Sequence, residues 1–154
     1  NEVESLYKEF FTQLLEKAKE KTDLHIDVNP QRNFCTATRN RLKYSYIVKT
    51  RPNDGCGRVE LYISQGDQAI NKKTYDGFSE KGEEIDGRFG SGLNWKGLTK
   101  KDSSSVAYKS YIIDYIIPKL TFEKINWPEL QDKMIDAMNR LEKAFQPFIQ
   151  KKKY

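Results

Sequence analysis

The first twenty residues carry apolar side chains at three- and four-residue intervals, with Glu and Lys between them. The apolar positions are Val3, Leu6, Tyr7, Phe10, Phe11, Leu14, Leu15 and Ala18. This spacing predicts an amphipathic helix over residues 2–21. Asn29-Pro30 then predicts a turn, because a proline disfavours helical geometry in the residue before it.

From residue 33 onward the apolar period changes to two, which is typical of β-strands. Two strands are expected on either side of a tight turn at Arg39-Asn40-Arg41, since Asn tolerates left-handed geometry. The segment RPNDGCG predicts a hairpin connection into a third strand within GRVELYISQG, residues 57–66. Three consecutive strands with short connections form an antiparallel meander.

A helical period returns after Gly66-Asp67 and ends at Gly90, a C-terminal stop. The glycines at 77, 82 and 87 would each cost about 1 kcal/mol relative to Ala, so this helix needs tertiary support or is broken. Leu93–Leu98 and Ser104–Ile113 predict one or two further strands, separated by the charged turn Lys100-Lys101-Asp102. Apolar residues at helical spacing predict a last helix over residues 127–149.

These elements predict a single α+β domain over residues 1–154, with a basic C-terminal tail at 150–154. A mainly antiparallel sheet would consist of the three-strand meander and one or two later strands, packed against N-terminal, central and C-terminal helices. The helices would cover one face of the sheet. The other face would be exposed, and its residues would be Lys43, Lys49, Arg58, Glu60 and Tyr62.

The distribution of charge is more informative than its total. The net charge is +5, but Lys151, Lys152 and Lys153 supply three of these charges. Between Asp27 and Asp54 there is no acidic residue, and the cations in this strip are Arg32, Arg39, Arg41, Lys43, Lys49 and Arg51. The strip predicts an anionic partner such as nucleic acid.

Composition argues against a membrane protein and against a disulfide framework. No apolar run approaches the roughly 18 residues that span a bilayer, and the N-terminus NEVESLYKEF lacks the layout of a signal peptide. A cytoplasmic protein is therefore expected. Cys35 and Cys56 are the only cysteines, and we expect both to be reduced packing residues.

Signatures of catalysis are sparse. His25 is the only histidine, so neither a His-rich metal site nor a nucleophile–histidine pair has an obvious basis, and we expect no metal and no cofactor. Glu60 lies in mid-strand, as a magnesium-binding carboxylate often does, but Tyr62 stands where a nuclease strand would carry lysine. No acidic residue lies in the two preceding strands either.

Four segments together resemble a bacterial family known only as a domain of unknown function. They are VELYISQGD, NKKTYDGF, FGSGLNW and WPELQDKMIDAMNRLEKAFQPFI. The resemblance covers nearly the whole chain, and in that family the domain often follows a restriction-endonuclease-like nuclease domain. Its recurring polar positions fall here on Arg58, Glu60, Tyr62, Asp67, Asn71 and Lys72. Arg58 and Glu60 are expected to lie beside the helix start at Asp67 to Lys72, where backbone N–H groups favour an anion.

The leading hypothesis is a non-catalytic nucleic-acid-binding or accessory module of a bacterial restriction or phage-defence system, with a nuclease-like partner in cis or in trans. Its expected ligand-binding residues are Arg39, Arg41, Lys43, Lys49, Arg58, Glu60, Tyr62, Asp67, Asn71 and Lys72. Glu60 would orient Arg58. Whether the chain is an enzyme is undecided, and a non-catalytic role is favoured.

Two alternatives remain open. One is a protein-interaction module or homodimer that uses the terminal helices, with Phe145, Phe148 and Tyr154 near an exposed end. The other is a magnesium-dependent nuclease that uses Glu60, Asp67 and Lys72.

Overall fold

Four α-helices and a five-stranded antiparallel sheet form the structure, a computed structural model that describes residues 2–49, 55–99 and 110–149. The helices are α1 (Glu2–Ala18), α2 (Gln68–Glu80), α3 (Gly82–Phe89) and α4 (Trp127–Phe145). The strands are β1 (Phe34–Arg39), β2 (Leu42–Val48), β3 (Gly57–Ile63), β4 (Asn94–Thr99) and β5 (Ser110–Ile116). The α+β class and the β1–β3 meander expected from the sequence are confirmed.

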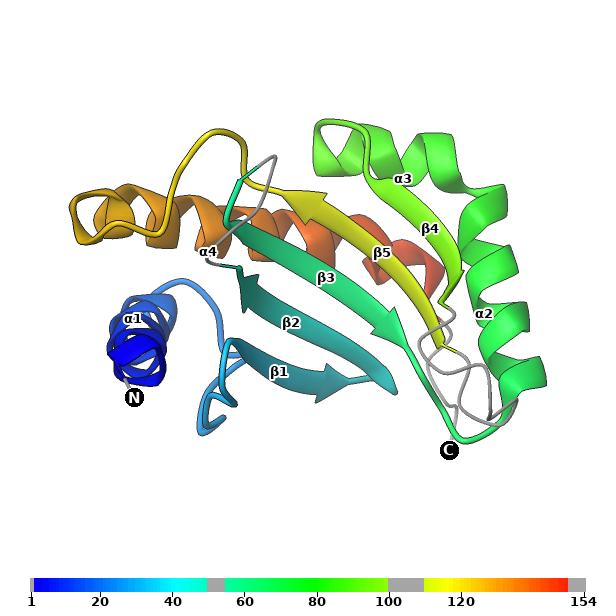
Figure 1. Cartoon of the computed structure of the whole chain (residues 1–154). Helices are drawn as coiled ribbons and strands as arrows, with labels where there is room; N and C mark the ends of the chain where they lie inside the picture. Colours follow the sequence, from blue (N-terminus) through cyan, green and yellow to red (C-terminus); the bar gives the residue numbers. More distant parts are fainter. Residues whose placement is uncertain (1, 50–54, 100–109, 150–154) are drawn as a thin grey trace.

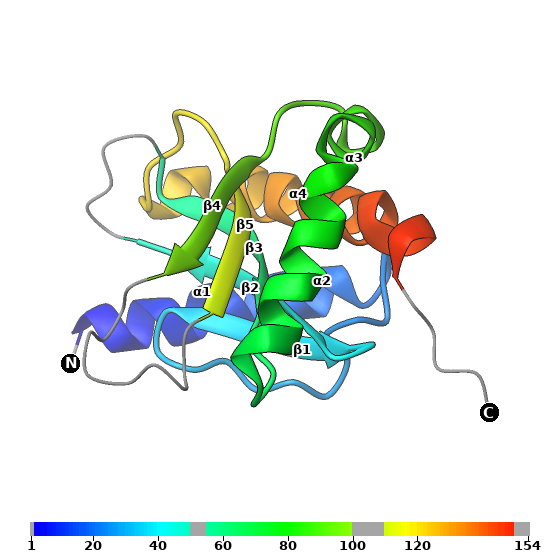
Figure 2. The ribbon, with the colours of Figure 1, turned by 90° about the vertical axis from the view of Figure 1, so that its right-hand side faces the viewer.

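The strand order is β1-β2-β3-β5-β4, so the last strand is inserted between β3 and β4. Every neighbouring pair is antiparallel. Figure 1 looks onto the sheet, with α4 passing behind it and α1 to one side. Figure 2 shows α2 beside β4 and β5, with α3 following it.

One face of the sheet forms the core with the helices, and we call it the covered face. Its fully buried side chains include Tyr44 and Tyr46 of β2, Leu61 of β3 and Ile113 of β5. The α4 helix closes this layer and also packs on α1, where the Phe10 and Trp127 rings meet edge-on at 5.4 Å. The Tyr75 ring of α2 stacks on Tyr111 of β5 at 4.9 Å.

Several element boundaries differ from the sequence expectations; the last helix, for example, ends at Phe145 and not at residue 149. The first helix ends at Ala18, not at residue 21. The central helix is broken at Lys81, and α3 then ends at Gly90 with a φ of 106°, the left-handed conformation expected of its stop. The last strand runs from Ser110 to Ile116, beyond the expected end at Ile113, because isoleucines on both faces hide its alternation.

Some expectations fall on residues outside the described ranges. These are residues 51–54 of the hairpin connection RPNDGCG, the turn at Lys100-Lys101-Asp102, the beginning of the predicted strand at Ser104, and the tail at 150–154. Cys35 and Cys56 are buried and free, as expected, and burial raises the pKa of Cys35 to about 12 and that of Cys56 to about 11. None of the described helices is both long enough and apolar enough to span a membrane.

His25 is a buried part of the covered face, only 5% exposed. Its Nε2 donates to the Tyr44 carbonyl oxygen at 2.9 Å, and its ring packs on Tyr46 at 4.6 Å. Burial lowers the pKa of His25 to about 4, below the ordinary histidine value of 6.5. The imidazole is therefore neutral in the folded protein at pH 7 and holds residues 19–28 against the sheet.

We expect acid to destabilise the protein through His25 before the carboxylates titrate. Because its folded pKa lies below its unfolded value, the free energy of unfolding should be constant above pH 6.5 and fall as the pH drops toward 4. The loss should reach about 3 kcal/mol, at 1.36 kcal/mol per pKa unit. Urea unfolding of wild type and His25→Gln across this range measures it. If the two proteins lose stability in parallel, His25 is not the titrating group.

Candidate functional site

The second face of the sheet carries no described helix, and we call it the open face (Figure 1). Strand register places on it Phe34, Thr36, Thr38, Lys43, Ser45, Ile47, Arg58, Glu60, Tyr62, Asn94, Ile112, Asp114 and Ile116. Lys43, Arg58, Glu60 and Tyr62 thus lie on one face, as the alternation predicts, but the expectation that all of them are exposed is wrong, because neighbouring side chains bury Glu60 and most of Arg58. Lys49 lies one residue beyond the end of β2.

A row of polar side chains crosses all five strands at the centre of the open face. Its members, in spatial order, are Thr36, Ser45, Glu60, Asp114 and Asn94, each directly opposite the next. We call it the polar row. Its side chains also bond to one another, since the Thr36 and Ser45 hydroxyl oxygens lie 2.7 Å apart and Asn94 Nδ2 donates to Asp114 Oδ1 at 2.9 Å.

Asp114 is the most heavily engaged member of the polar row. Its carboxylate is 1% exposed, and Oδ2 lies 2.6 Å from Lys96 Nζ and 3.7 Å from Arg58 Nη1. Lys96 and Asn94 belong to β4, whereas Arg58 belongs to β3. A single buried carboxylate on β5 therefore ties both neighbouring strands to itself through charge-assisted contacts.

Glu60 lies directly opposite Asp114, so two acidic side chains meet across neighbouring strands. Glu60 is 8% exposed. Cations surround this pair, because Arg58 and Lys96 contact Asp114 and Lys43 lies one row away. Among the described residues no group of three or more His, Cys, Asp or Glu could hold a metal ion. As observed, Asp114 is the centre of an ion-pair network and also accepts a hydrogen bond from Asn94.

The more accessible part of the open face combines aromatic rings with cations. Lys43 Nζ lies 5.8 Å from the Tyr62 ring centroid, and both residues are partly exposed. At the other end of the sheet Phe34 is 39% exposed, opposite Ile47. Such a face offers stacking surfaces and positive charge a few ångströms apart.

Arg39 does not belong to the open face. It pairs with Leu42 in the register, which turns its side chain to the covered face. Its Nη2 donates to Asp23 Oδ1 and its Nη1 to Glu142 Oε2, both at 2.7 Å. The Arg39 guanidinium holds the pKa of Asp23 below its usual value, and both carboxylates raise that of Arg39. Arg39 thus joins α4 to the loop after α1.

The structure does not bring Arg58 and Glu60 to the helix start at Asp67. Arg58 is the second residue of β3, and Ile63, the last, is five positions further along the strand. At 3.4 Å per residue this is about 17 Å. Asp67 instead caps α2, because its Oδ1 accepts from the backbone N–H of Ala69 at 2.8 Å.

Asn71 and Lys72 also have local partners. Asn71 is buried, and its side-chain amide makes both hydrogen bonds to the Gln65 backbone, at 2.7 and 2.9 Å, which fixes the β3–α2 connection. The Lys72 ammonium pairs with Asp76 at 2.6 Å on the exposed surface of α2. Hydrogen bonding to Asp76 raises the pKa of Lys72. Arg41 lies in the exposed β1–β2 turn.

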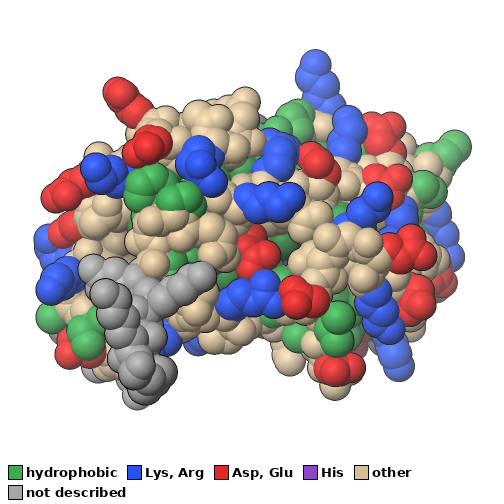
Figure 3. Space-filling view, turned by 180° about the vertical axis from the view of Figure 1, so that it is seen from behind, with side chains coloured by type: hydrophobic (Ala, Val, Ile, Leu, Met, Phe, Trp, Pro, Cys, Tyr) green, Lys and Arg blue, Asp and Glu red, His purple; other side chains and the backbone are tan. Residues whose placement is uncertain are grey.

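Sequence reasoning missed Asp114, Asn94 and Lys96. The one available signal was the single carboxylate inside the apolar run SYIIDYII, where a buried acid requires a partner. On the helix-covered side, Lys and Arg are interspersed with Asp and Glu over much of the surface (Figure 3).

Replacing Asp114 by alanine should destabilise the protein by about 3 kcal/mol, because it leaves the largely buried Arg58 guanidinium without its counter-charge. It also releases Asn94 and Lys96 of edge strand β4, so the β4 amides should exchange faster with deuterium. Urea unfolding and hydrogen exchange measure both effects. Asp136→Ala is the control, because its exposed pair with Arg140 should cost under about 1 kcal/mol. Equal losses of unfolding free energy in the two variants would show that Asp114 does not hold β4 to the sheet.

Comparison with known proteins matches the chain to a family whose description assigns no activity. No curated protein and no solved structure matches the chain. Residues 6–149, which include every strand and the whole polar row, match the family described as a domain of unknown function, DUF4268. The chain therefore belongs to the DUF4268 family.

Proposed function

We propose that the open face binds single-stranded nucleic acid and catalyses no reaction on it. The supporting observation is the combination of Lys43, Tyr62 and Arg58 on a sheet face over which no described helix packs. Proteins that bind single strands combine cations that track the phosphates with aromatic rings on which bases stack. The open face has both, with Tyr62 near Lys43 and with Phe34 at its far end.

A single strand fits this surface better than a duplex. Reading a duplex in its major groove requires a protruding helix or ribbon, and no described helix packs over the open face. A sheet face without a helix over it instead presents ring faces, which can stack only on unpaired bases.

The carboxylates of the polar row do not make the face repulsive to phosphates. Glu60 and Asp114 contribute two negative charges, while Lys43, Arg58 and Lys96 contribute three positive ones. Carboxylates can also accept hydrogen bonds from base amino groups. We infer moderate affinity, with phosphate contacts from Lys43, Lys49 and Lys96, since Arg58 is 13% exposed and is held by Asp114.

We also propose that this module belongs to a bacterial restriction or phage-defence system, which is what the family resemblance of its sequence implies. It would hold the single strand while a nuclease domain, in the same chain or a partner, cuts the nucleic acid. The nuclease alternative for this chain has less support, because Asp67 caps α2 and Lys72 pairs with Asp76. The dimer alternative loses one of its expected contact residues, because Phe145 is fully buried in the core and cannot contact a partner.

The test is binding of a labelled mixed-sequence single strand, as DNA and as RNA, followed by fluorescence anisotropy. With three phosphate contacts, log Kobs against log[salt] should have a slope of about −2. Lys43→Gln should make the slope shallower by about 0.7. Tyr62→Ala should weaken binding about tenfold or more without changing the slope, because it removes stacking and no charge.

Lys8→Gln is the matched control, since Lys8 is an exposed cation of α1 outside the open face. It should behave as wild type, and circular dichroism should show that all variants are folded. Absence of binding, or wild-type behaviour of Lys43→Gln and Tyr62→Ala, contradicts the proposal. With Mg²⁺ present we expect the strand to stay intact; cleavage that Glu60→Gln abolishes would favour the nuclease alternative instead.

A further inference from the structure

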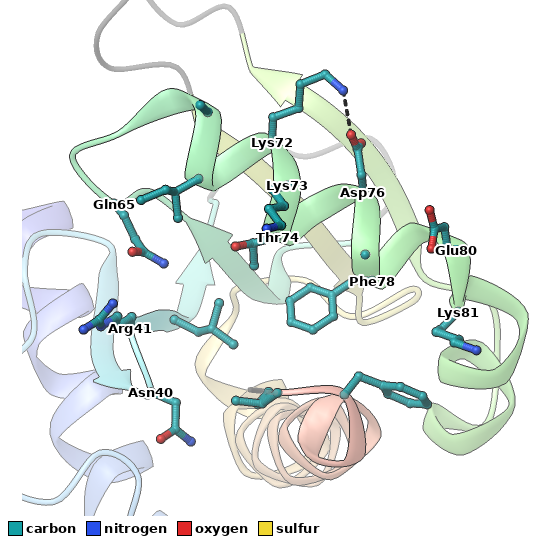
Figure 4. Close-up of a pocket in the computed structure, with 16 residues that line it drawn as sticks. Asn40, Arg41, Gln65, Lys72, Lys73, Thr74, Asp76, Phe78, Glu80 and Lys81 are labelled. Carbon is teal, nitrogen blue, oxygen red and sulfur yellow. Dashed lines mark hydrogen bonds and ion pairs between the residues drawn. The ribbon is translucent and has the colours of Figure 1, made fainter. Parts of the chain in front are cut away.

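A groove of about 920 Å³ lies on the helix-covered side of the molecule, between α2, the β1–β2 turn and the 3-10 helix that follows α4 (Gln146–Phe148). Figure 4 shows α2 on one side of it, Asn40 and Arg41 of the turn on another, and the end of α4 below. It shares no residue with the open face.

The floor of the groove is apolar. Leu42 and Phe78 are buried core residues that also line it, and the Phe78 ring meets Phe145 edge-on at 4.9 Å. Phe148 and Ile149 extend the floor beneath the turn. Ile70 is 45% exposed at the rim, so an apolar side chain of the groove remains in contact with water.

The rim of the groove carries an excess of positive charge. Lys72 is neutralised by Asp76 at 2.6 Å (Figure 4). Arg41, Lys73 and Lys81 also line the groove, and no described carboxylate forms an ion pair with any of the three. Glu80 is the one further acid among the lining residues, so the rim retains about two positive charges.

Arg41 is held at the mouth by its backbone. Asn40 and Arg41 have φ values of 54° and 66°, the left-handed pair that a two-residue hairpin turn requires. The turn joins two strands of the sheet, so its position is set by the ladder between β1 and β2. The guanidinium therefore projects from a rigid support opposite the lysines of α2.

We propose that this groove binds an acidic amphipathic helix of a partner protein. An apolar floor with cations on its rim is complementary to a helix whose leucines face down and whose carboxylates lie at the sides. The edge strands β1 and β4 supply no lining residue, so an added β-strand would find no backbone to pair with. A helix satisfies its own backbone hydrogen bonds and needs none from the groove.

Nucleic acid suits this groove less well than a helix does. Asp76 and Glu80 stand on the same wall as the lysines, where they would repel a continuous phosphate backbone. The floor combines aliphatic side chains with the buried ring of Phe78 and the partly exposed ring of Phe148, a surface on which leucine side chains can pack. The proposal does not depend on nucleic-acid binding by the open face.

The probe is a labelled synthetic peptide with leucines at i, i+3, i+4 and i+7 and glutamates at its flanking positions. It should bind by fluorescence anisotropy, and the amide NMR shifts it causes should map to α2, the β1–β2 turn and residues 146–149. The same peptide with lysine in place of glutamate should not bind. A scrambled acidic peptide, which breaks the leucine spacing, should bind more weakly.

Two surface variants test the apolar contacts and the charge of the rim separately. Ile70→Ser should weaken binding of the acidic peptide about tenfold, because it removes exposed apolar area. Lys73→Glu should weaken it about fivefold by reversing a rim charge. Lys8→Glu changes the net charge by the same amount away from the groove and should have no effect.

Several outcomes overturn the proposal. One is absence of binding by the acidic peptide, and another is equal binding of the acidic and basic peptides. Wild-type affinity in both Ile70→Ser and Lys73→Glu would also exclude the groove. Shifts of the groove amides on adding single-stranded DNA, with no response to the peptide, would assign the site to nucleic acid. None of these results changes the expectations for Lys43→Gln and Tyr62→Ala.

Discussion

The close approach of α4 to β3 determines how the rest of the molecule is arranged. At Gly57 a Cβ atom would lie 2.8 Å from Leu130 Cδ1 and 2.9 Å from Met134 Sδ, so the helix rests where a side chain would otherwise stand. Contact at this distance allows the apolar stripe of α4 to fill the covered face at interior packing density. With α4 seated there, α1 and α3 pack on it and the opposite face is left to polar side chains.

The one-sided cover also explains why the polar row is built as it is. A carboxylate as buried as Asp114 would be costly without partners, and its two neighbouring strands supply an amide and two cations. The same contacts hold edge strand β4, whose register shifts between Trp95 and Gly97. The open face is therefore both a binding candidate and part of what keeps the sheet together.

Much of the fold could be predicted from local pattern, but the strand order could not. Alternation placed Arg58, Glu60 and Tyr62 on one face because a strand period of two needs no long-range information. Insertion of β5 between β3 and β4 depends on packing between distant segments, and SYIIDYII carries isoleucine on both faces. Asp114 was missed for that reason. The sequence groups Arg39 with Lys43 among the expected ligand-binding residues. The two-residue turn at Asn40-Arg41 instead pairs Arg39 with Leu42 on the covered face.

The strand order has a consequence for how the chain folds. The β1–β3 meander contains only local pairings. The second neighbour of β3 is β5, which lies far along the chain, as the pairing of Arg58 with Ile116 shows. The covering helix α4 is the last of the α-helices in the sequence. Contacts between distant segments slow folding, because the chain loses entropy when the loop closes before strand pairing contributes any stabilising free energy. During synthesis the apolar side of the meander is therefore exposed until most of the domain has left the ribosome. Nascent chains of this topology should need protection by a chaperone in that interval.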